Sequence, residues 1–94
     1  MSQDDARLDR ANSADPLVPF IRELLLKLVD HPEQVEVRVE AGHPTLYEAR
    51  VAPDDIGQVV GREGRIVKAL RTLVAAAAMK RGDRATFEIA EPGA

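Results

Sequence analysis

Cysteine and tryptophan are missing from this chain of 94 residues, and aromatic residues make up only 3% of it. Without cysteine the chain has no disulfides, thiolate nucleophiles or cysteine-ligated zinc sites. With so few aromatic residues, its core must be aliphatic. No apolar run approaches the roughly 18–20 residues of a membrane span, and residues 1–14 lack the apolar centre of a signal peptide. We therefore expect a soluble, cytoplasmic protein that does not associate with membranes.

The length fits one domain, because domains commonly contain roughly 100–150 residues. Residues 1–14 carry many charged side chains and a single large apolar one, Leu8, so we expect a flexible N-terminal tail there. Residues 92–94 include a proline and a glycine and should form a C-terminal tail. The domain itself is then expected to span residues 15–91.

Basic residues are few overall but are concentrated in one stretch. The formal net charge is −3, which at first argues against a phosphate-bearing partner. However, residues 61–81 contain six basic residues and one acidic residue, and the other three segments, residues 1–15, 16–60 and 82–94, each carry a net negative charge. A polyanion could therefore bind on one face, and the acidic surroundings should oppose binding elsewhere.

The N-terminal half of the domain predicts a helix and a hairpin. Apolar residues recur with the helical period from Leu17 to Leu28. That helix begins either at Asp15-Pro16 or near Pro19, and the sequence Asp-His-Pro at residues 30–32 ends it. Residues 35–41 and 47–51 alternate apolar and polar positions, which predicts two antiparallel strands joined by a short turn.

The C-terminal half predicts two helices and a third strand. A short helix is expected over residues 53–60 and a longer one over residues 65–80, with Gly82 capping its end. Residues 85–89 alternate as a strand. The order α-β-β-α-α-β predicts an α+β fold whose helices pack on one face of a three-stranded sheet.

The stretch between the two C-terminal helices has the pattern G-x-x-G. Two glycines three residues apart let the backbone turn tightly and let a ligand approach without a Cβ in the way. The helix that follows presents free N–H groups and a positive dipole end, both of which suit phosphate. This pattern alone most often marks an ordinary tight helix–helix turn. Its place between the second and third helices, followed by basic residues, favours the nucleic-acid-binding loop of a KH module.

Three runs of sequence resemble a known family, the small stand-alone bacterial KH proteins of the KhpA (YlqC) type. They are VAPDDIGQVVGREGRI at residues 51–66, KALRTLV at residues 68–74 and LVDHP at residues 28–32. The element order is that of a type II KH domain, and the resemblance covers nearly the whole domain. It implies a protein that binds single-stranded RNA, not an enzyme, with no catalytic residues and no cofactor. It also implies self-association and pairing with a larger partner of the KhpB (Jag) type.

The candidate RNA-binding residues lie in the G-x-x-G turn and on the two helices beside it. In the turn and just after it, glycines would admit phosphates, basic side chains would add charge, and flanking aliphatic residues would line a groove for bases. These residues are Ile56, Val60, Gly61, Arg62, Glu63, Gly64, Arg65, Val67 and Lys68. Glu63 departs from the basic or neutral residue of many KH loops and should weaken phosphate binding.

The long helix is apolar around more of its circumference than packing on one sheet requires. Ordinary helix propensity explains part of this pattern. The alternative is a dimer seam formed by Thr72, Leu73 and Ala76, where small residues allow close approach of a second helix.

Other chemistry is weakly supported. The two histidines, His31 and His43, have no second ligand at helical spacing, so no metal site is expected, and His31 is interpreted as ending the first helix near its negative dipole end. Asp54 and Asp55 point about 100° apart on a helix, so they fit dipole compensation better than paired acid–base catalysis. A P-loop motif is absent, and an RRM would need more aromatic residues.

Three functions remain open. The leading one is an RNA chaperone or adaptor that binds single-stranded RNA with low sequence specificity. The second is a dimerising protein-interaction module, a scaffold for a KhpB type partner with little RNA affinity of its own, which Glu63 and the low aromatic content favour. The third is an accessory factor in ribosome assembly.

Overall fold

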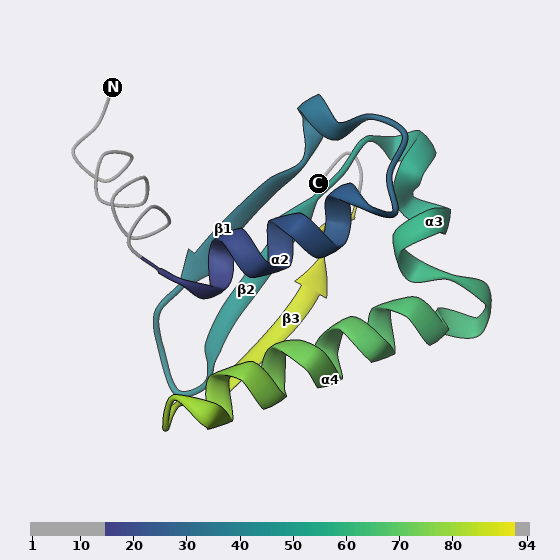
Figure 1. Ribbon diagram of the computed structural model, residues 1–94. Coiled ribbons are helices and arrows are strands. Elements are labelled where there is room, and N and C mark those ends of the chain that lie inside the picture. Colours follow the sequence, from purple (N-terminus) through teal and green to yellow (C-terminus); the bar gives the residue numbers. More distant parts are fainter. Residues whose placement is uncertain (1–14, 92–94) are drawn as a thin grey trace.

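In the computed structural model, which describes residues 15–91, the helices lie over one face of a three-stranded sheet (Figure 1). The tails expected at residues 1–14 and 92–94 lie outside these described residues. The order along the chain is α2 (Leu17–Leu26), β1 (Glu36–Glu40), β2 (Thr45–Arg50), α3 (Ile56–Val60), α4 (Arg65–Lys80) and β3 (Ala85–Ile89). The predicted α-β-β-α-α-β order and fold class are confirmed. Within residues 15–91, no helix is long and apolar enough to cross a bilayer.

The sheet has the order β1-β2-β3, so β2 is central. It runs antiparallel to β1, which confirms the predicted hairpin, and parallel to β3. On the covered face, Tyr47 of β2 lies opposite Val39 of β1 and Phe87 of β3, and all three side chains are buried. On the uncovered face, charged residues of β1 and β2 lie opposite one another. The alternation of the sequence therefore sets which face of each strand receives the helices.

The two longer helices, α2 and α4, each contribute a stripe of aliphatic residues to the core. Leu17, Ile21 and Leu25 of α2 are buried at a spacing of four residues. The longer α4 buries Val67, Leu70, Val74 and Ala78 at the same helical period. The short α3 buries only Val59, which is fully enclosed. The long helices therefore have broad contacts with the sheet, and α3 is fixed by one apolar side chain and its polar neighbours.

The helix ends agree with the sequence in part. Oδ1 of Asp15 accepts a 2.9 Å hydrogen bond from the N–H of Leu17, so the earlier of the two predicted starts is the correct one. The end of α2 falls at Leu26, before the expected Leu28. The N–H groups of Leu28 and Val29 both donate to the carbonyl of Leu25 and close a turn there. The chain thus leaves the helix well before the proline at position 32.

The end of α4 matches its prediction. Gly82 has a φ of +81°, and its N–H donates to the carbonyl of Met79 at 2.9 Å. The N–H of Asp83 reaches back to the carbonyl of Ala78, also at 2.9 Å. This pair of bonds is the Schellman arrangement, in which a glycine in the left-handed conformation satisfies the last carbonyls of a helix.

Candidate nucleic-acid interface

The G-x-x-G turn between α3 and α4 is a tight 3₁₀ turn, η3 (Arg62–Gly64), with a left-handed backbone. Gly61, Glu63 and Gly64 have φ values of +78°, +56° and +72°. Gly61 is required for a second reason, because a Cβ there would lie 2.6 Å from Cγ1 and 2.9 Å from Cβ of Ile66. At Gly64 a Cβ would meet only Cγ1 of Val67, at 3.8 Å. The first glycine thus allows α3 and α4 to approach closely, and the second serves the turn itself.

Two backbone amides of the turn are available to a ligand. The N–H of Gly61 donates to the carbonyl of Gly57, that of Gly64 to Gly61 and that of Arg65 to Arg62. Among residues 15–91, no acceptor is present for the amides of Arg62 and Glu63. Adjacent free amides in a turn with left-handed residues form a concavity that suits an anion such as a phosphate oxygen.

Charged side chains lie in the turn and on the first residues of α4. Arg62, Arg65 and Lys68 are all exposed. Oε2 of Glu63 lies 3.6 Å from Nη2 of Arg65, and these side chains are 74% and 78% exposed. An exposed pair of this kind contributes little to stability, so a phosphate can displace it. Glu63 therefore pairs with one of the cations beside the turn when no ligand is bound.

An apolar groove of about 380 Å³ lies beside the turn. It brings together Ile56 and Val60 of α3 with Val67 of α4, the three aliphatic residues chosen from the sequence. Sequence reasoning missed the rest of the lining, which consists of Arg71, Glu88, Ile89, Ala90 and Glu91. The one available signal was that Arg71 lies one helical turn after Val67, on the same side of α4.

Arg71 is held in place at the groove. Its Nε donates a 3.2 Å hydrogen bond to the carbonyl of Phe87 in β3. The groove lining is therefore aliphatic where the helices form it and also includes the guanidinium of Arg71 and the carboxylates of Glu88 and Glu91. Apolar surface with a few placed polar groups is the usual composition of a ligand site.

The residues expected in a dimer seam lie on the solvent side of α4. Thr72, Leu73 and Ala76 are all exposed, and Leu73 is 45% exposed. Met79, one turn further along, is 71% exposed. The hydroxyl of Thr72 donates to the carbonyl of Lys68 at 3.1 Å. This strip is separate from the buried stripe of the same helix.

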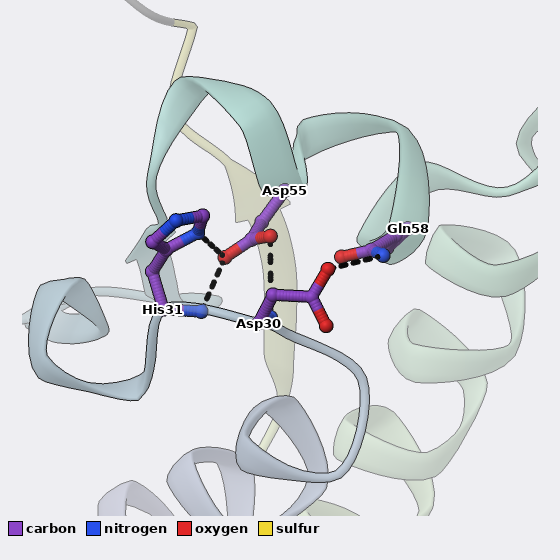
Figure 2. Close-up of polar contacts among 4 residues, drawn as sticks. All are labelled: Asp30, His31, Asp55 and Gln58. Carbon is purple, nitrogen blue, oxygen red and sulfur yellow. Dashed lines mark hydrogen bonds and ion pairs between the residues drawn. The ribbon is translucent and has the colours of Figure 1, made fainter.

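Two interpretations outside the turn need correction. His31 does not end α2, because that helix already stops at Leu26. The ring Nδ1 of His31 lies 3.1 Å from Oδ2 of Asp55 instead (Figure 2). Asp55 is 1% exposed and accepts backbone hydrogen bonds from Asp30 and His31, so it does more than compensate a helix dipole. Asp54 remains exposed. Sequence spacing could not show this contact, because 24 residues separate its partners.

Together, the element order, the G-x-x-G turn between α3 and α4 and the adjacent apolar groove define a KH domain. A family model described as "KhpA/KhpB, KH domain" matches residues 19–89. The chain belongs to the KhpA/KhpB family of KH-domain proteins. The predicted family resemblance is confirmed.

Individual relatives agree with this assignment. A protein of Chlamydia pneumoniae is 41% identical over 73 residues, which cover 77% of this chain and 94% of the relative. A protein of Caldanaerobacter subterraneus subsp. tengcongensis is 46% identical over 71 residues, with coverages of 74% and 95%. A protein of Clostridium acetobutylicum is 46% identical over 63 residues, with coverages of 66% and 84%. All three relatives bear the name RNA-binding protein KhpA. No solved structure matches the chain.

Proposed function

We propose that this chain binds single-stranded RNA at its G-x-x-G turn and along the adjacent groove, with little sequence preference, as an RNA chaperone or adaptor. The names of its relatives support RNA as the ligand. One observation carries the choice of site. A turn with two free amides, at Arg62 and Glu63, is continuous through Val60 and Val67 with an apolar groove.

The groups of the site divide the work between backbone and bases. The free amides and the cations Arg62, Arg65 and Lys68 would bind phosphate oxygens. Ile56, Val60 and Val67 would contact the faces of unstacked bases. Because these contacts are apolar, they distinguish poorly between bases, which supports low specificity.

Gly64 offers the sharpest test of the site. We expect Gly64→Asp to weaken binding of a fluorescent single-stranded RNA by roughly tenfold or more, because it places a carboxylate beside the bound phosphate. Gly64→Asn is the matched control, since it has nearly the same shape without the charge and tolerates the left-handed backbone. Equal affinities for the two variants, measured by anisotropy, would reject the turn as the phosphate site. Gly61 is unsuitable, because any side chain there would collide with Ile66.

Salt dependence tests the electrostatic part of the proposal. If three cations each neutralise a phosphate, the logarithm of the association constant should fall with the logarithm of salt concentration with a slope of about −2. Duplex RNA should bind more weakly than single strands, because the groove admits only unstacked bases. A slope near zero would argue against phosphate binding at this turn.

Self-association would raise the affinity of a weak single module. One KH module contacts about four nucleotides, so a dimer that presents two grooves gains avidity. The exposed strip of Thr72, Leu73 and Ala76 on α4 supports such a homodimer. Membership of the KhpA/KhpB family supports the proposed pairing with a KhpB type protein.

The second candidate function is a dimerising scaffold with little RNA affinity, which the exposure of Leu73 and Met79 favours. Leu73→Asp should lower the mass measured by light scattering. Gln34→Asp, which adds the same charge to an exposed 3₁₀ turn, should leave it unchanged. An unchanged mass for Leu73→Asp at equal concentration would remove Leu73 from any dimer interface. RNA binding that is absent at tens of micromolar protein, with the dimer intact, would favour the scaffold.

A further inference from the structure

Asp55 is the only charged residue that is buried within residues 15–91, at 1% exposure. A buried carboxylate is tolerated only when its oxygens are paired. Oδ1 accepts the N–H of Asp30 at 3.2 Å, and Oδ2 accepts the N–H of His31 at 3.0 Å. The ring Nδ1 of His31 also lies 3.1 Å from Oδ2 (Figure 2). The carboxylate therefore has partners at both oxygens, and all of them belong to one short segment.

A second contact joins the same two parts of the chain. Nε2 of Gln58 donates a 3.0 Å hydrogen bond to Oδ2 of Asp30. Asp55 and Gln58 stand three residues apart, at the start of α3 and within it, so both face the connection between α2 and β1. We call Asp30, His31, Asp55 and Gln58 the Asp55 cluster.

The Asp55 cluster bears on the groove through α3. This helix contains only five residues and buries only Val59, so it cannot hold its own position by helix propensity. Its other aliphatic side chains, Ile56 and Val60, line the groove, and its last residue leads into Gly61 of the turn. A shift of α3 would therefore move one wall of the groove and the entry to the turn together.

We propose that Asp55 is a positioning residue for RNA binding, which fixes α3, and with it the groove wall of Ile56 and Val60, by accepting hydrogen bonds from the segment Asp30-His31. This inference rests on the proposed RNA-binding function. It adds that affinity at the turn is set partly by a buried carboxylate that does not contact RNA.

The charge of His31 adds a pH dependence to this role. The hydrogen bond to Asp55 raises the pKa of His31 above 6.5, although partial desolvation opposes it, and the nearby carboxylates Asp54 and Glu33 act in the same raising direction. Burial works against ionisation of Asp55, but the N–H groups of Asp30 and His31 and the His31 ring together hold its pKa below 3.8.

The sign of the pH effect follows from these two shifts. The stabilisation that the charged His31 ring gives to the cluster is complete below pH 6.5, and it is lost as the pH rises through the raised pKa of His31. The contribution of Asp55 is complete above pH 3.8 and is lost as the pH falls through its lowered pKa. The cluster is therefore strongest between these values and loosens toward alkaline pH.

The test compares Asp55→Asn with Asp54→Asn in the full chain, using a fluorescent uridine oligomer. Asparagine keeps the size of Asp55, but its NH₂ group cannot accept the N–H that the second carboxylate oxygen accepts. We expect Asp55→Asn to weaken binding by roughly tenfold, the size of one lost charge-assisted hydrogen bond. Asp54→Asn, which removes the same charge from an exposed neighbour that acts on His31 only weakly, should bind at least as tightly as the wild type does. Equal binding by the two variants, both folded, would overturn the proposal.

A second variant covers the case in which Asp55→Asn does not fold. The affinity of the wild type should fall between about pH 5.5 and about pH 8, and His31→Gln should flatten this profile. His43, the other histidine, provides a control, since His43→Gln should keep the wild-type profile. A profile in His31→Gln as steep as that of the wild type would overturn the proposal.

Hydrogen exchange separates failure of this proposal from failure of RNA binding. If the wild type binds no RNA, the proposed function falls, but the positioning part is still decided by exchange at the amides of residues 56–61. Faster exchange there in Asp55→Asn or His31→Gln, with α4 unchanged, supports positioning of α3 by Asp55. Unchanged exchange in these amides would overturn it.

Discussion

The hydroxyl of Tyr47 donates a 2.7 Å hydrogen bond to Oδ2 of Asp15, which joins the central strand to the start of α2. Oδ1 of the same carboxylate accepts the N–H of Leu17, so Asp15 both caps the helix and accepts the hydrogen bond of the buried phenol. Tyr47 is 3% exposed. A single carboxylate thus fixes where α2 begins relative to the sheet.

Removing this hydroxyl should destabilise the fold. We expect Tyr47→Phe to lower the free energy of unfolding by about 1–2 kcal/mol, because it leaves one oxygen of Asp15 without its buried donor. Urea denaturation followed by circular dichroism measures this change. An unchanged midpoint would show that water replaces the phenol without loss.

Ionisation of Tyr47 should make stability fall at alkaline pH. Burial, followed by the hydrogen bond to Asp15, raises the pKa of Tyr47 above its ordinary 10.0. The stabilisation is therefore complete below pH 10.0 and is lost as the pH rises through the raised value. Because this is the only tyrosine, the absorbance of tyrosinate reports on Tyr47 alone. Tyr47→Phe should lose stability less steeply in this range, and an ordinary titration midpoint in the folded protein would contradict the prediction.

Two glycine-to-alanine changes should have opposite effects on stability. Apart from the adjacent residues and nearby helix backbone, no atom lies within 4 Å of a Cβ added at Gly57 or Gly82, so backbone conformation decides the sign. Gly57→Ala in α3 should stabilise by about 0.5–1 kcal/mol, because alanine favours the helix. Gly82→Ala should destabilise by about 1 kcal/mol, because its φ is +81°. Thermal denaturation of the two variants measures this difference, and shifts of equal sign would contradict it.

Glu63 should limit the affinity of the turn for RNA. Glu63→Gln removes a negative charge beside Arg65 and beside the bound phosphate, so we expect binding roughly threefold tighter. Glu40→Gln makes the same change of net charge on the uncovered face of the sheet. Equal gains in both variants, measured by anisotropy, would assign the effect to net charge rather than to the turn.

Local patterns predicted most of the fold. The alternation of Val37 and Val39 with charged neighbours identified the buried face of β1. The glycine turn before residue 65 and the cap at Gly82 indicated the two ends of α4. These features depend on near neighbours in the chain. The strand β2 starts at Thr45, two residues before the expected start at Tyr47. The N–H of Thr45 donates to the carbonyl of Arg84, and local alternation could not indicate this contact because Arg84 lies far along the sequence.

The candidate site was predictable only where it is continuous in sequence. The turn and its flanking residues Val60 and Val67 share one stretch, so spacing alone placed them together. Ile89 reaches the groove through the parallel pairing of β3 with β2, which no local pattern indicates. Asp55 looked like an ordinary first-turn carboxylate, because its burial depends on a segment 24 and 25 residues away.

The uncovered face of the sheet limits the path of a bound strand. Glu36 lies opposite Arg50 and Arg38 opposite Glu48, whereas Glu40 lies opposite Leu46 and has no basic partner in the register. This face keeps an excess of negative charge and repels a polyanion. An RNA held at the turn would therefore stay on the helical side and could not encircle the domain. Each copy would occupy only a short footprint and leave the rest of the transcript open to other molecules.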